Sequence, residues 1–101
     1  MEAYNVVFTE HARNLLLQHV SFLVGISPNA ARKLYNAVYA KIEILYENPF
    51  QYPIWQVSFE LPHEYRKLVV NKRYLIIYFI DGNNVFVDYV FDCSMDNSKF
   101  I

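Results

Sequence analysis

Apolar residues repeat with two different spacings along the chain, and the change between them predicts the order of the elements. Residues 4–8 are β-branched and aromatic, which predicts a short strand. Over residues 12–26 and 28–47 the apolar side chains recur at steps of three and four, which predicts two amphipathic helices. After residue 64 the spacing falls to two, and three more strands are predicted at 65–70, 73–80 and 84–91.

Both predicted helices have start signals, and the second also has a stop signal. Thr9 can cap the first helix, and Glu10 lies in its first turn, where the helix dipole favours an acid. Ser27 can cap the second helix, and Pro28 suits its first position because the N–H that proline lacks would have no partner there. An Asn-Pro pair at 48–49 ends this helix.

The apolar stripe of each helix predicts the side that faces the core. In the first helix the stripe consists of Leu15, Leu16, His19, Phe22, Leu23 and Ile26. In the second helix it consists of Ala31, Leu34, Val38, Ile42 and Leu45. We therefore expect both helices to cover one face of a sheet.

Polar segments between the strands predict tight turns. Asn71-Lys72 is short enough for a two-residue turn, and asparagine tolerates the left-handed backbone that such a turn needs. Asp81-Gly82-Asn83 is a second strong turn signal. The connection at 49–63 contains three prolines with aromatic residues between them, and we expect it to be packed by its rings, with a short strand at 57–60.

These elements predict one α+β domain over residues 1–101, in the order β-α-α-β-β-β. A two-helix hairpin is expected to pack on a mainly antiparallel sheet, because the two short turns make the last three strands neighbours. The pattern leaves the partner of the first strand open.

Composition and charge narrow the class of protein. A hydrophobic content of 54% excludes a disordered chain, and a formal net charge of −1 argues against a surface that binds nucleic acid all over. The charge is unevenly spread, because residues 64–73 carry +3 and residues 74–101 carry −3. A single cysteine permits no internal disulfide, and no apolar run is long enough for a bilayer, so we expect a cytoplasmic protein.

Several stretches in this order carry a resemblance to a known family. They are residues 31–38, 44–49, 61–70 and 72–78, the turn at Asp81-Gly82, and the alternating Val85 and Val87 of the last strand. The ordered set resembles the RelE/ParE superfamily of bacterial toxins from type II toxin–antitoxin pairs. The resemblance implies a growth-inhibiting toxin that a cognate antitoxin neutralises by folding on it.

The resemblance implies two different targets on one fold. RelE-like members cut messenger RNA on the ribosome, whereas ParE-like members act on DNA gyrase. A third reading is a catalytically inert or attenuated relative that acts only as a protein-binding module. No cofactor is expected from any of the three.

Candidate catalytic residues follow from the metal-independent ribonuclease reading. Arg66, Lys67 and Arg73 lie in the basic segment, and arginine can grip two phosphate oxygens at once. Related sequences usually have an arginine where this chain has Ser94, and a serine supplies no positive charge. Because Asp92 would also repel a phosphate, the sequence leaves open whether the chain is an enzyme.

Other residues suggest binding or core roles. Tyr35, Tyr39 and Tyr46 form a row along the second helix, which we interpret as a surface for a protein partner because tyrosine combines apolar area with a polar tip. His19 is expected in the core or an interface. Cys93 with His63 could be imagined as a nucleophile and base, but a lone cysteine beside a strand is more often a small buried hydrophobe. No zinc-like spacing of ligands is found, so no metal is expected.

Overall fold

The computed structural model describes residues 3–93 and contains the predicted elements in the predicted order. The elements are β1 (Asn5–Phe8), α1 (Glu10–Val24), α2 (Pro28–Leu45), the short 3₁₀ helix η1 (Pro49–Gln51), β2 (Tyr65–Val70), β3 (Tyr74–Asp81) and β4 (Asn84–Asp92). The prediction of an α+β fold with a helix hairpin on a mainly antiparallel sheet is confirmed.

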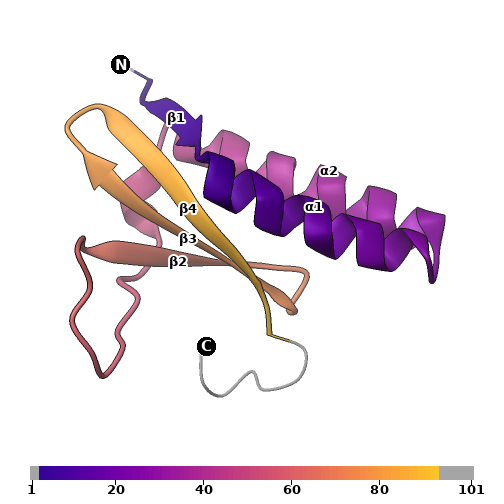
Figure 1. The fold of residues 1–101 in the computed structure, drawn as a ribbon. Coiled ribbons are helices and arrows are strands. Elements are labelled where there is room, and N and C mark those ends of the chain that lie inside the picture. Colours follow the sequence, from indigo (N-terminus) through magenta and orange to yellow (C-terminus); the bar gives the residue numbers. More distant parts are fainter. Residues whose placement is uncertain (1–2, 94–101) are drawn as a thin grey trace.

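The sheet has the strand order β1-β4-β3-β2, and both helices lie across one of its faces (Figure 1). Strands β2, β3 and β4 form an antiparallel meander. The first strand, whose partner the sequence leaves open, pairs in parallel with β4, and Val6 lies opposite Val85. The two ends of the described chain therefore meet in the same sheet.

The helix starts use the caps that the sequence predicts. The hydroxyl of Thr9 accepts a hydrogen bond from the backbone N–H of Ala12 at 3.1 Å. The hydroxyl of Ser27 accepts one from the N–H of Ala30 at 3.2 Å, and Pro28 occupies the first position of α2. Each cap satisfies an N–H that has no partner within its helix.

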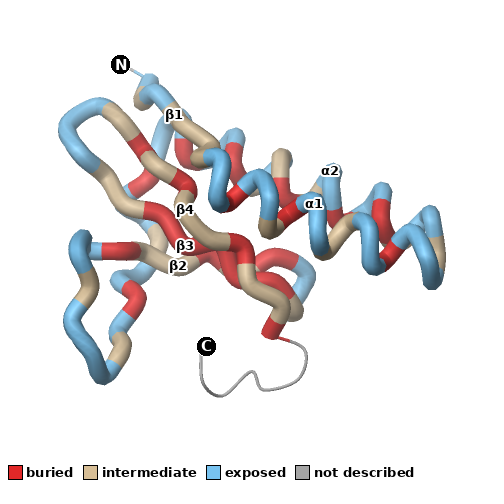
Figure 2. The backbone as a smooth tube through the Cα atoms, in the orientation of Figure 1, coloured by how far each residue is buried: buried red, intermediate tan, exposed pale blue. Residues whose placement is uncertain are grey.

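The protein has two apolar clusters, one on each face of the sheet. The buried residues are concentrated in the strands of the sheet and along the helices (Figure 2). The larger cluster lies between the helices and the sheet and includes all five residues of the predicted α2 stripe. The smaller cluster lies on the opposite face. Its buried residues are Trp55, Tyr65, Leu75, Ile77 and Cys93. The prediction that the connection at 49–63 packs by its rings is confirmed by Trp55, which contacts Tyr65 and Phe91.

A bulge in β4 allows this strand to place side chains in both apolar clusters. The pairing between β3 and β4 shifts after Ile77, which leaves Asp88 as an extra residue. Val87 and Val90 can therefore both face the helices although they are three residues apart. The carboxylate of Asp88 accepts a hydrogen bond from the hydroxyl of Tyr65 at 2.8 Å, so the bulge is fastened to the edge strand.

The turn between β2 and β3 has the predicted left-handed geometry. Asn71 and Lys72 have φ values of 55° and 59°, and the N–H of Arg73 donates to the carbonyl of Val70 at 3.1 Å. Two successive positive φ values match the twist of a hairpin. Gly82, with φ 61°, takes the left-handed position in the turn between β3 and β4, which glycine adopts without steric strain.

Two predictions of local structure are wrong. Phe22 and Ile26, assigned to the core face of the first helix, are 63% and 68% exposed. They lie at the tip of the helix hairpin, which extends beyond the end of the sheet and therefore has no strand to pack on (Figure 1). Residues 57–60 form no strand; instead, Ile54 makes an isolated bridge to Arg66 on β2.

No helix within residues 3–93 is both long and apolar enough to cross a membrane.

One buried hydroxyl ties the connection after α2 to the central strand. The side chain of Tyr78 is fully buried, and its hydroxyl donates to the carbonyl of Pro49 at 2.5 Å. Burial raises the pKa of Tyr78 above its ordinary value, so this hydroxyl keeps its proton and its role as donor. The bond fixes η1 against the sheet.

Replacing Tyr78 by phenylalanine should lower the free energy of unfolding by about 1–2 kcal/mol, because the buried carbonyl of Pro49 loses its donor. Urea denaturation measures the change. Tyr74→Phe is the matched control: Tyr74 is a buried tyrosine on the same strand and in the same cluster, and no hydrogen bond from its hydroxyl is found within residues 3–93. Equal losses in the two variants would contradict the assigned role of the hydroxyl.

The thiol of Cys93 should react with Ellman's reagent far more slowly in the folded protein than in the unfolded chain at pH 8. The residue is buried in the smaller cluster, and burial followed by the charge of Asp92 raises the pKa of its thiol. The unfolded thiol ionises near pH ~8.5 while the folded thiol stays protonated, so the free energy of unfolding should fall as the pH rises above that value. A Cys93→Ala variant should lack this component, and similar reaction rates in the two states of the wild type would refute the prediction.

Candidate functional site

Arg66 holds the connection between α2 and β2. It lies on β2, and its guanidinium donates to the carbonyl of Tyr52 at 2.6 Å and to that of Phe50 at 3.3 Å. The same group lies 5.2 Å from the centroid of the Phe50 ring, which adds a cation–π contact. The guanidinium is thus engaged with the chain's own backbone.

Lys67 follows Arg66 on the same strand. Successive side chains of a strand leave it toward opposite faces of the sheet, so Arg66 and Lys67 start from different faces of β2. The backbone N–H of Lys67 donates to the carbonyl of Pro53 at 3.0 Å, which pairs β2 with the connection. Both side chains line an open depression on this edge with Pro53, Ile54 and Gln56.

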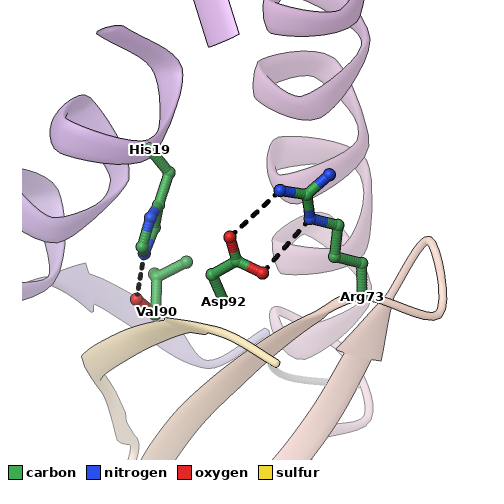
Figure 3. Close-up of polar contacts among 4 residues, drawn as sticks. All are labelled: His19, Arg73, Val90 and Asp92. Carbon is green, nitrogen blue, oxygen red and sulfur yellow. Dashed lines mark hydrogen bonds and ion pairs between the residues drawn. The ribbon is translucent and has the colours of Figure 1, made fainter. Parts of the chain in front are cut away.

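Arg73 forms a two-point ion pair with Asp92 (Figure 3). Its Nε donates to one carboxylate oxygen at 3.2 Å, and its Nη2 donates to the other at 3.1 Å. The hydrogen bond to Asp92 raises the pKa of Arg73 above its ordinary value, so the guanidinium remains charged. The third guanidinium nitrogen points away from Asp92.

The predicted basic residues do not converge on one site. Arg66 lies four residues before the end of β2, a distance of about 13 Å along a strand, whereas Arg73 follows the turn beyond that end. Ser94 lies outside the described residues. Within residues 3–93, the predicted catalytic side chains therefore form two separate places on the surface.

His19 supports the same region from the helix side. Its Nε2 donates to the carbonyl of Val90 at 2.8 Å, and its ring lies 5.5 Å from that of Tyr74 (Figure 3). The carbonyl can only accept, so the proton resides on Nε2. His19 is half-buried and its ring is satisfied by these contacts, which agrees with the expectation of a histidine in the core or an interface.

The tyrosine row is present along α2. The rings of Tyr35 and Tyr39 lie 4.8 Å apart, and Tyr39 also contacts Phe8 edge to face. Tyr46 lies at the C-terminal end of α2, about 10 Å further along the helix axis than Tyr39. Tyr35 and Tyr46 are 45% and 40% exposed, so part of each side chain is accessible to solvent.

Cys93 and His63 do not form a catalytic pair. Cys93 is buried, whereas the exposed ring of His63 stacks on Phe79 with 3.8 Å between centroids. No group of three histidine, cysteine or acidic side chains that could hold a metal ion is found within residues 3–93.

A second basic place lies at the tip of the helix hairpin, and the sequence reasoning missed it. Lys33 on α2 and Arg73 in the β2–β3 turn line one pocket there, although they are 40 residues apart in the chain. The adjacent basic pairs at 32–33 and 72–73 were visible in the sequence. Their proximity was not, because it depends on how the hairpin lies over the β2–β3 turn.

Comparison with known proteins addresses the family directly. A family model for the ParE toxin of the type II toxin–antitoxin system, parDE, matches residues 6–97. Among solved structures, the chain resembles the chromosomal ParDE toxin–antitoxin system from P. aeruginosa with a TM-score of 0.70. The match covers 88% of this chain and 95% of the other at 16% identity, so it supports the fold alone. A search of curated proteins finds no match.

The family match covers most of the chain and agrees with the resemblance carried by the helix, turn and strand motifs of the sequence. The chain therefore belongs to the ParE toxin family of type II toxin–antitoxin systems.

Proposed function

We propose that this chain is a cytoplasmic toxin that arrests growth by binding a protein target, and that a cognate antitoxin neutralises it. The main support is the state of the two arginines that a ribonuclease would need. Arg66 donates to two backbone carbonyls, and Arg73 donates to both oxygens of Asp92. A phosphate would have to displace these partners.

The electrostatics at Arg73 also favour a protein target over messenger RNA. Charge stabilisation of a phosphoryl transition state needs preorganised donors aimed at the reacting group. Here the carboxylate of Asp92 lies within hydrogen-bond distance of the guanidinium and cancels its charge. DNA gyrase is the target that the resemblance implies for ParE-like members, and we propose it for this chain.

A second candidate function is ribosome-dependent cleavage of messenger RNA. It is favoured by the +3 charge of residues 64–73, in which four basic residues stand against one acid. The third candidate is an inert relative that only binds a partner. The exposed tyrosine row on α2 is compatible with that reading as well as with the toxin.

Expression of the chain alone should stop growth, and co-expression of the antitoxin encoded beside it should restore growth. If gyrase is the target, the purified chain should inhibit the supercoiling of plasmid DNA by gyrase, and expression should induce the DNA-damage response while messenger RNA stays intact. New cuts in messenger RNA, mapped by primer extension, would favour the second candidate. Normal growth without any antitoxin would favour the third.

Arg73→Ala separates the first two candidates. The variant should arrest growth as strongly as the wild type, because the guanidinium is engaged with Asp92 and not with a substrate. Its free energy of unfolding should fall by about 0.5–1 kcal/mol, since the ion pair is partly exposed. Loss of growth arrest in a variant that keeps its thermal stability would overturn the protein-target proposal.

A further inference from the structure

A stripe of exposed residues runs along α2 on the side opposite its buried stripe. Its members recur at alternating steps of four and three residues, so they lie on one line along the helix. The line is about 27 Å long, because each helical residue advances the chain by about 1.5 Å. We call this stripe the outer face of α2, and its members are Asn29, Lys33, Asn36, Ala40, Glu43 and Glu47.

The two halves of the outer face carry opposite charges. Lys33 lies in the first half, whereas Glu43 and Glu47 lie in the second. Arg32 adds to the basic half, because its guanidinium donates to the side-chain oxygen of Asn29 at 3.0 Å and so lies along the same face. No ion pair of these four charged residues is found among residues 3–93. Both halves therefore present their charge to the surroundings.

The acidic half is electrostatically unfavourable in the isolated chain. Glu43 and Glu47 are four residues apart, so their carboxylates lie on the same side of the helix and repel each other. Glu43 also lies in the last turn of α2, where the helix dipole is negative and no basic residue is present. The two acids border an open depression of about 440 Å³, together with Ala40 and the exposed Ile44. A partner for this half must bring positive charge and apolar contact.

The basic half of the same face meets this requirement when a second copy lies antiparallel. Lys33 and Glu43 each lie five residues from Val38, and Asn29 and Glu47 each lie nine residues from it. A two-fold axis at the height of Val38, perpendicular to the helix, places Lys33 of one protomer level with Glu43 of its partner. The same axis places Asn29 level with Glu47. Every contact is formed twice, because the interface is symmetric.

The centre of the outer face suits a close approach of two helices. Asn36 and Ala40 lie two residues on either side of the proposed axis, and their side chains are short. The antiparallel orientation also opposes the two helix dipoles. A parallel orientation would place Lys33 against Lys33 and Glu43 against Glu43, which like-charge repulsion disfavours.

We propose that two copies of this chain associate through the outer face of α2, antiparallel and around a two-fold axis. The observation that identifies the occupant is the self-complementary order of charges along this face. The proposal is independent of the target of the toxin. A single helix face buries less surface than a stable dimer needs, so the association is weak and depends on concentration.

Sedimentation velocity of the purified full chain measures the association. As the concentration rises toward about 1 mM, the average mass should approach that of a dimer, and added salt should reverse the change. Lys33→Glu and Glu43→Lys should each weaken self-association at least about tenfold, because either change creates two repulsive contacts in a two-fold interface.

A mixture of the two variants gives the sharpest result. One chain then carries acids at positions 33 and 43 and the other carries bases at both, so both contacts between unlike charges are formed again. The mixture should associate within about threefold of the wild type, although each variant alone does not. Neither a change in folding nor a general change in net charge would produce this recovery.

Lys41→Glu is the matched control. It makes the same charge change on the same helix, but Lys41 lies three residues from Val38 and four from Leu45, both buried, and so outside the outer face. Its self-association should stay within about twofold of the wild type. Thermal melts show whether each variant folds. Should Lys33→Glu fail to fold, Lys33→Gln removes the charge without reversing it and should still weaken the association measurably.

Four outcomes would overturn the proposal. The wild type stays monomeric up to about 1 mM. The wild type associates and Lys33→Glu and Glu43→Lys associate equally well, which assigns the contact to another surface. The two variants lose association and their mixture does not recover it, which excludes the antiparallel pairing. Species larger than a dimer grow with concentration, which shows a contact that does not close on itself.

Discussion

The structure depends on the burial of strand β3 on both of its faces. Tyr74, Ile76 and Tyr78 contact the helix side, while Leu75 and Ile77 lie in the cluster on the opposite face. Because β3 is also paired on both edges, it has no exposed side. The helix hairpin packs on one face of this strand, and Trp55 of the connection after α2 packs on the other. Tyr78, on the helix side, fixes the start of that connection. The positions of the two basic surfaces, one at Arg66 and one at Arg73, follow from the packing of these two layers.

Much of the positive charge of the basic segment makes contacts inside the fold and is therefore less accessible to a partner. The uneven distribution along the sequence, basic before residue 74 and acidic after it, is partly neutralised where Arg73 meets Asp92 across the sheet. The guanidinium of Arg66 similarly donates hydrogen bonds to backbone carbonyls. A basic segment that looks in sequence like a nucleic-acid site thus contributes substantially to holding the loops and strand ends.

The order of elements could be predicted because helices, caps and turns depend on neighbouring residues. Asn71 acts within its own turn and Ser27 at the start of its own helix, and the roles predicted for both are confirmed. Phe22 and Ile26 were assigned to the core because helical spacing says which residues share a face, but not where the sheet beneath that face ends. The pocket between Lys33 and Arg73 was beyond prediction for the same reason: it joins segments whose proximity arises only from packing. The partners of Arg66 and Arg73 are also distant from them in the sequence, so the pattern could not predict them.

The parallel pairing of β1 with β4 has a consequence for how the toxin is made. Val6 lies opposite Val85, so β1 cannot join the sheet until β4 has been synthesised. Contacts between residues so distant in sequence form late, because the long loop between them must close first. A ribosome that has released only the helices and β2 holds a chain without β3, and therefore without a sheet on which to fold. The complete surface of this protein therefore forms only after β4 has joined the sheet.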